Sequence, residues 1–139
     1  MVLDIIFILI VSLVFMPNGY AMVDGPALST FNLMVSLLFL LVWFAYGFYR
    51  GKGQRAKFLV LASVYWAGTL LLVFLDTKLL GEQFFSLFLF TFAPLAGFLT
   101  LVSSDYADYS VLLYLLPLIV TACGYLAGSK LKPKVIEMN

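Results

Sequence analysis

Five apolar runs separated by short polar segments account for most of the chain. Four of these runs are uncharged and long enough to cross roughly 30 Å of hydrocarbon as helices. They are about residues 29–49, 58–75, 84–102 and 110–129. The first run, about 2–22, is weaker because a Pro-Asn-Gly segment at 17–19 follows its apolar core. It also resembles a signal peptide, but Asp4 stands where such peptides carry positive charge, so we expect a helix.

The composition indicates that these helices have no polar shell around them. Hydrophobic residues make up 64% of the 139-residue chain, charged residues make up 11%, and the mean hydropathy is +1.10. A soluble domain of this size needs a polar surface, so we expect lipid to solvate the outside. The sequence predicts an all-α integral membrane protein of the plasma membrane, with one domain over residues 1–139 and a bundle of about five transmembrane helices. Four spans with one re-entrant or broken segment are the alternative.

Four cations gather between the second and third predicted helices, in the segment "RGKGQRAK". They are Arg50, Lys52, Arg55 and Lys57. Cations at the end of a span usually stay in the cytoplasm and fix the orientation, and they can also contact anionic lipid headgroups. A phosphate-binding loop is excluded, because three residues rather than four separate Gly47 from the Gly-Lys pair, and a glycine follows the lysine.

A second set of cations, Lys130, Lys132 and Lys134, conflicts with five spans. If residues 50–57 are cytoplasmic, three crossings place these lysines outside, and the positive-inside bias disappears. One solution is a broken or re-entrant helix at Pro94 or Pro117, with its freed backbone groups buried in protein. A second solution is insertion in both orientations as an antiparallel pair. The sequence favours a third, in which the tail lies outside and residues 50–57 set the orientation.

Small residues lie on one face of each of the last two predicted helices. Such a stripe marks a place where another helix packs, because small side chains let two backbones approach closely. The predicted packing seam consists of Ser86, Ala93, Gly97 and Thr100 in the fourth helix, and of Pro117, Thr121, Gly124 and Gly128 in the fifth.

Polar residues also lie within the second and third predicted helices. An amide in hydrocarbon needs partners, so Asn32 predicts a hydrogen bond to a neighbouring helix or, alternatively, a contact with a ligand or ion. If the chain forms a transporter or channel, a polar pathway would be lined by Asn32, Ser36, Tyr65, Thr69 and Asp76.

Residues suited to catalysis are scarce. The chain has no histidine and a single cysteine, Cys123, which removes the commonest general base and any disulfide within the chain. Asp105 and Asp108 stand three residues apart and could hold a divalent cation, but the pair stands alone and favours a solvated turn. A net charge of +1 offers no surface for nucleic acid. The sequence therefore predicts no enzyme, no cofactor, no metal site and no nucleic-acid partner.

The function expected from these patterns is helix–helix association. The chain would serve as an accessory or assembly subunit or as an oligomeric membrane component. Its partners would be membrane lipids and either further copies of itself or a larger membrane protein. A small oligomeric transporter or channel, inserted in one or both orientations, is the alternative.

Overall fold

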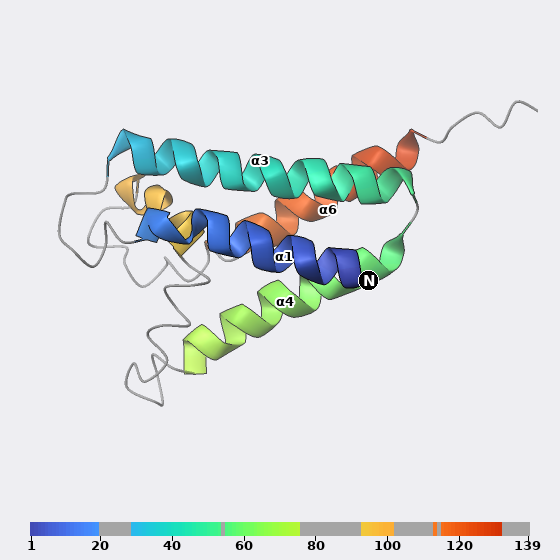
Figure 1. The fold of residues 1–139 in the computed structure, drawn as a ribbon, viewed down its shortest axis with the longest axis horizontal. Coiled ribbons are helices and arrows are strands. Elements are labelled where there is room, and N and C mark those ends of the chain that lie inside the picture. Colours follow the sequence, from blue (N-terminus) through green and yellow to red (C-terminus); the bar gives the residue numbers. More distant parts are fainter. Residues whose placement is uncertain (20–28, 54, 76–92, 102–112, 114, 132–139) are drawn as a thin grey trace, which may run out of the picture.

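The computed structural model describes residues 1–19, 29–53, 55–75, 93–101, 113 and 115–131. Every regular element in these residues is a helix (Figure 1). The elements are α1 (Val2–Phe15), η1 (Met16–Gly19), α3 (Thr30–Lys52), α4 (Ala56–Leu75), η3 (Ala93–Leu101) and α6 (Leu115–Lys130). The prediction of an all-α fold is confirmed for this part of the chain.

The first apolar run forms α1 followed by the short 3₁₀ helix η1, instead of one continuous helix. Pro17 cannot donate a backbone hydrogen bond, so α-helical bonding ends just before it. The buried side chains of α1 recur every three or four residues, which gives the helix one face toward the rest of the bundle. They are Asp4, Ile8, Val11, Ser12 and Phe15.

The helix α3 lies at the centre of the bundle and contacts α1, α4, η3 and α6. Ser29 precedes it as the N-cap residue, and its backbone N–H donates to Asn32 Oδ1 at 3.0 Å. The helix continues past the predicted end at residue 49 and includes Arg50 and Lys52. The first half of the basic segment is therefore helical, with Gly53 as the C-terminal cap.

The helices α3 and α6 run parallel and in close contact. A Cβ added at Gly124 would meet the carbonyl oxygen of Phe44, and one added at Gly128 would meet that of Phe48. Residue numbers thus increase together along the two helices, so their C-terminal ends lie side by side. Backbones approach this closely only where a helix carries small residues.

The helix α6 spans Leu115–Lys130, within and one residue beyond the predicted helix at 110–129. Pro117 therefore lies in the first turn of the helix, where the backbone nitrogen needs no partner within the helix and proline is tolerated. The predicted helix start at 110–112 lies outside the described residues.

Aromatic side chains fill the space between α1, α3 and α4. Trp43 and Trp66 pack edge to face with ring centroids 5.3 Å apart, and Phe39 lies against both indoles. Trp43 and Phe39 are 0% exposed, and Phe58 and Trp66 are 1% exposed. This cluster is the core that joins α3 to α4.

The fourth predicted helix, 84–102, is described only from Ala93, and that part is the 3₁₀ helix η3. Nine residues at about 2.0 Å each extend about 18 Å, less than the hydrocarbon core. Residues Ala93 to Phe98 are all buried, and Gly97 packs on the backbone of Asn32 at the start of α3. A bundle of five spans is therefore not confirmed.

The start of α1, the end of α3, the start of α4 and the end of α6 lie together at the opposite end of the bundle from η3 (Figure 1). All six charged residues in the described part of the chain belong to these ends. They are Asp4, Arg50, Lys52, Arg55, Lys57 and Lys130. Because α3 and α6 are parallel, Lys130 leaves the bundle beside the end of α3. The sequence favoured an odd number of crossings between residues 50–57 and Lys130, whereas the parallel helices place Lys130 at the same end of the bundle as the end of α3.

Two helical stretches, Val2–Gly19 and Thr30–Lys52, are long and apolar enough to cross a membrane by length and composition. The apolar stretches of α4 and α6, Ala56–Leu72 and Leu115–Lys130, are shorter than 18 residues.

Candidate functional site

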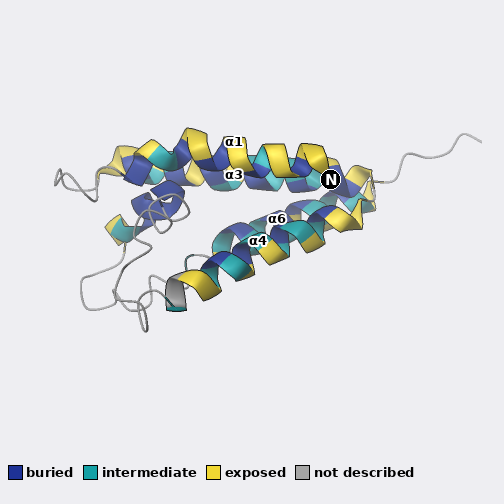
Figure 2. Cartoon of the chain, turned by 60° about the horizontal axis from the view of Figure 1, so that its bottom comes forward, coloured by how far each residue is buried: buried dark blue, intermediate teal, exposed yellow. Residues whose placement is uncertain are grey.

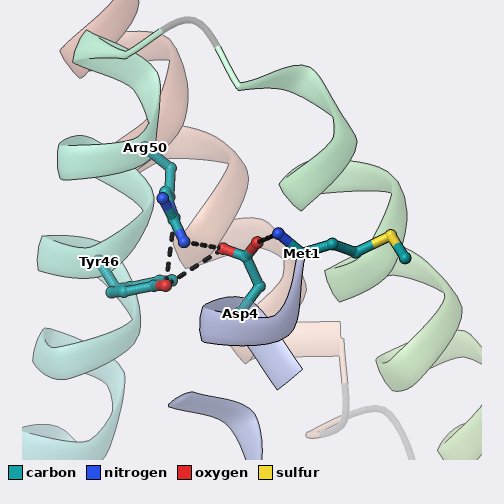
Figure 3. A network of polar contacts seen from close by, with 4 residues as sticks. All are labelled: Met1, Asp4, Tyr46 and Arg50. Carbon is teal, nitrogen blue, oxygen red and sulfur yellow. Dashed lines mark hydrogen bonds and ion pairs between the residues drawn. The ribbon is translucent and has the colours of Figure 1, made fainter. Parts of the chain in front are cut away.

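A buried ion pair links the start of α1 to the end of α3 (Figure 3). The Arg50 guanidinium contacts Asp4 Oδ1 at 2.5 Å, and both residues are only 4% exposed. The Tyr46 hydroxyl donates to the same Asp4 oxygen at 3.1 Å and accepts from Arg50 Nε at 3.1 Å. The amino group of Met1 contacts the second carboxylate oxygen of Asp4 at 2.9 Å.

In this triad of Asp4, Tyr46 and Arg50, each polar side chain is hydrogen-bonded or ion-paired to the others. A buried charge is tolerated when it is paired and hydrogen-bonded, and each charge here has both kinds of partner. Phe7 stacks on the Tyr46 ring with centroids 3.6 Å apart, which holds the hydroxyl in place. The arrangement neutralises two charges and sets the register of α1 against α3.

Sequence reasoning placed Asp4 and Arg50 separately and did not join them. Arg50 was expected to act with its three neighbours as an exposed topogenic or lipid-binding cation. The structure buries Arg50 and leaves the other three exposed, so Arg50 differs from Lys52, Arg55 and Lys57. The available signal was an acidic residue one turn into an otherwise apolar helix, because such a residue needs a cation nearby.

A second buried polar cluster lies at the other end of the bundle and holds η3 in place. The Asn18 side-chain amide donates to Ser36 Oγ at 3.0 Å and lies 3.5 Å from the carbonyl oxygen of Pro94. The backbone N–H of Gly97 donates to Ser36 Oγ at 3.0 Å. Asn32 donates to Asn18 Oδ1, also at 3.0 Å. Side chains from η1 and α3 thus satisfy backbone groups of η3 that an α-helix would have satisfied internally.

The predicted polar pathway does not form one continuous set in the described residues. Asn32 and Ser36 belong to the cluster beside η3, whereas Tyr65 bonds to Ser12 Oγ at 2.9 Å between α1 and α4. Along α3, the buried side chains of Phe39 and Trp43 lie between Ser36 and the basic end of the helix. The Tyr65 ring stacks on Trp43. Thr69 is buried in α4, and Asp76 lies outside the described residues.

The residues of the predicted packing seam are mostly buried within the chain. Ala93 and Gly97 of η3 pack against Gly19 and the start of α3. Pro117, Thr121, Gly124 and Gly128 are the buried residues of α6 and face α3. Thr100 is exposed, and Ser86 lies outside the described residues. The small residues therefore serve contacts inside one copy of the chain.

Two buried indole N–H groups, those of Trp43 and Trp66, lack a hydrogen-bond partner within the described structure. An unsatisfied buried donor costs about 1–3 kcal/mol. Burial of the two aromatic rings in the core must therefore offset the cost of the two unbonded N–H groups.

The charged end of the bundle is hollowed. A cavity of about 480 Å³ is lined by Met1, Asp4, Arg55, Ala56, Lys57 and Phe58. A second, of about 260 Å³, is lined by Tyr49, Arg50, Lys52, Gly53 and Arg55. Each cavity is lined by at least two basic side chains, and the larger one also contacts Asp4, which is paired with Arg50.

The described residues contain no group of three or more side chains suited to holding a metal ion. The predicted solvated turn at Asp105 and Asp108 lies outside the described residues. The chain matches no protein-family model, and comparison with curated proteins and with solved structures gives no match.

Proposed function

We propose that the chain is an integral membrane protein whose described helices form a polarised bundle. The supporting observation is an inverted distribution of side chains, in which many large apolar residues are exposed and eight polar or charged residues are buried. Figure 2 shows the exposed faces of the helices in yellow and the buried faces in dark blue. The buried polar residues are Asp4, Ser12, Asn18, Asn32, Ser36, Arg50, Thr69 and Thr121. Exposed apolar residues include Leu9 and Ile10 of α1, Leu38 and Leu41 of α3, and Leu71 of α4. Lipid solvates such a surface, whereas water does not.

The orientation proposed for this bundle places its charged end in the cytoplasm. The Asp4–Arg50 pair is neutral overall, so the exposed charged side chains at that end are those of Lys52, Arg55, Lys57 and Lys130, all positive. Cytoplasmic segments next to spans carry such an excess of lysine and arginine. With both basic segments on one side, η3 is a broken segment near the opposite surface, which was the alternative architecture expected from Pro94.

Within the membrane the chain acts by association, as an accessory or assembly component. Its interior is filled by the aromatic core, and the described residues hold neither a catalytic set nor a continuous polar route. The protein would therefore contact other molecules through the outer faces of its helices. Since its small-residue seams are used internally, these contacts are made by large apolar side chains.

A photo-crosslinking amino acid placed on the outer face of each helix tests this role. Suitable exposed positions are Leu9 in α1, Leu41 in α3, Leu71 in α4 and Ile119 in α6. In native membranes, we expect at least one position to give a discrete protein adduct, either a second copy or a larger membrane protein. If all four positions give only lipid adducts, the association role is wrong.

Transport by an oligomer is the second candidate and has less support. A pathway through one copy would have to pass Phe39, Trp43 and Trp66, which close the centre of the bundle. A route between copies would need polar residues on an outer face, and the outer faces of α1 and α3 are apolar. Flux in proteoliposomes that disappears with Asn32→Leu would favour transport over association.

A further inference from the structure

A groove runs along the surface between α1 and α4 and opens into the charged end of the bundle. The lower part of the groove is the part farthest from the charged end and has a volume of about 270 Å³. It shares Leu61 and Val64 with a middle part of about 310 Å³. The middle part shares Met1 and Lys57 with the cavity of about 480 Å³ at the charged end. The three hollows therefore follow one another along α4, each sharing lining residues with the next.

The groove exists because α1 and α4 both pack on α3 and make few close contacts with each other. At its lower end the Ser12 and Tyr65 hydroxyls meet at 2.9 Å and join the two helices. The seven helical steps from Phe58 to Tyr65, at 1.5 Å each, give this part of the groove a length of about 10 Å along α4.

The chemistry of the groove changes along its length. The lower part is lined by aliphatic side chains, including Ile5, Ile8 and Leu61, together with the ring of Tyr65. The upper part is lined by Arg55 and Lys57, both exposed. The carboxylate at this end, Asp4, is already paired with Arg50. Within the described residues, no ion pair engages Arg55 or Lys57.

We infer that this groove binds one anionic phospholipid, with an acyl chain along Leu61 and Val64 and the headgroup phosphate between Arg55 and Lys57. This inference rests on the proposed membrane placement. A groove that is apolar along the membrane depth and cationic at its cytoplasmic mouth complements an anionic lipid, and basic pockets between membrane helices bind such headgroups. Arginine and lysine together supply a planar donor pair and a point charge for phosphate. A free phosphate would use the cations alone and leave the aliphatic part of the groove without an occupant.

Native mass spectrometry of the full chain tests the site. The protein is titrated with phosphatidylglycerol and with phosphatidylcholine of identical acyl chains, and inorganic phosphate is the competitor. We expect one lipid per chain to bind, with about a tenfold or greater preference for phosphatidylglycerol, since each cation near the surface contributes on the order of 1 kcal/mol. Inorganic phosphate at the lipid concentration should not displace it.

Two matched pairs of variants locate the site. The double variant Arg55→Gln/Lys57→Gln should lose the preference, whereas Lys52→Gln/Lys130→Gln, with the same charge change at the same end, should keep it. Leu61→Trp fills the groove and should lower the occupancy of both lipids, whereas Leu71→Trp on the exposed face of α4 should not. All six substituted positions in these four variants are exposed or half-exposed, so folding should be preserved.

Other results would overturn the inference. An equal loss of preference in both double variants means diffuse surface charge and no site. Displacement by inorganic phosphate together with normal binding in Leu61→Trp means a phosphate site without an acyl chain. Extraction of the chain from membranes by alkaline carbonate overturns the membrane placement itself, whereas a chain that resists extraction but shows no lipid preference overturns only this site.

Discussion

Arg50 shows how strongly the position of one residue on a helix decides its role. It lies two residues before Lys52 in the same basic segment, yet its side chain is buried and paired while that of Lys52 is exposed. The difference follows from helical geometry, because residues 43, 47 and 50 share the buried face of α3. Continuation of α3 past residue 49 therefore turns a basic residue inward to meet Asp4.

The hydroxyl of Tyr46 should be worth a measurable part of the stability of the triad. Tyr46→Phe removes a group that bonds to both Asp4 and Arg50. We expect the free energy of unfolding to fall by about 1–3 kcal/mol, because both charges lose a buried partner. The matched control is Tyr49→Phe, whose side chain is exposed. Unfolding by titration with SDS measures both variants, and equal effects would contradict the account.

The ion pair itself should show strong coupling in a double-mutant cycle. Asp4→Leu alone leaves a buried guanidinium without its carboxylate partner, and Arg50→Met alone leaves a buried carboxylate without its guanidinium partner. Each should lower the free energy of unfolding by about 3–5 kcal/mol, whereas the double variant Asp4→Leu/Arg50→Met should recover most of it. Unfolding in SDS again provides the readout. Additive losses in the double variant would mean that the two residues do not interact.

At the scale of elements, the contact between α3 and α6 depends on glycines in both helices. Gly47 and Gly51 of α3 face the backbone of α6, and Gly124 and Gly128 of α6 face the backbone of α3. In each case the neighbour is a backbone group, which cannot rotate away as a side chain can. The two backbones can approach this closely because each glycine has only a hydrogen atom in place of a side chain.

Adding a methyl group at this contact should push the helices apart. Gly124→Ala places a Cβ against the carbonyl oxygen of Phe44, and we expect a loss of about 1–3 kcal/mol in the free energy of unfolding. Gly68→Ala in α4 meets nothing within 4 Å and should be neutral or stabilising by about 0.5–1 kcal/mol, because alanine favours the helix. Thermal unfolding in detergent compares the two variants. An unchanged free energy of unfolding in Gly124→Ala would contradict the close contact between α3 and α6.

Proline positions explain where elements differ from continuous helices. Pro17 ends α1, and Pro94 lies at the start of a 3₁₀ segment whose backbone is satisfied by Asn18 and Ser36. Pro117 has no such effect, because it lies in the first turn of α6. A proline in a sequence therefore indicates that a helix is interrupted or that a helix begins. Which of the two occurs depends on whether side chains elsewhere in the fold can bond the backbone groups that the proline leaves free.

At the scale of the whole molecule, apolar runs predicted helices well but did not predict their pairing. Run length and composition identify α3 and α4 within a few residues, since these features act locally. Asp4 and Arg50 are 46 residues apart, and nothing local indicates that they meet. The glycines of α6 signal close packing, yet their spacing gives neither the partner helix nor its direction. The parallel pairing of α3 with α6, which brings the basic ends together, could not be predicted for this reason.

The central claim is that residues 50–57 and Lys130 lie on the same side of the membrane. It follows from the parallel packing of α3 with α6 and from the placement of η3 at the other end of the bundle. In this arrangement the bundle has one basic end, and the groove between α1 and α4 opens there beside Arg55 and Lys57.

Labelling of single cysteines with a membrane-impermeant reagent tests this claim most directly. Gly53→Cys and, separately, Lys130→Cys are placed in a background of Cys123→Ala, and both positions are exposed. In inside-out vesicles both cysteines should react, and in intact cells neither should react until the membrane is permeabilised. Labelling of the two positions from opposite sides would contradict the account, and labelling of both positions from both sides would mean insertion in two orientations.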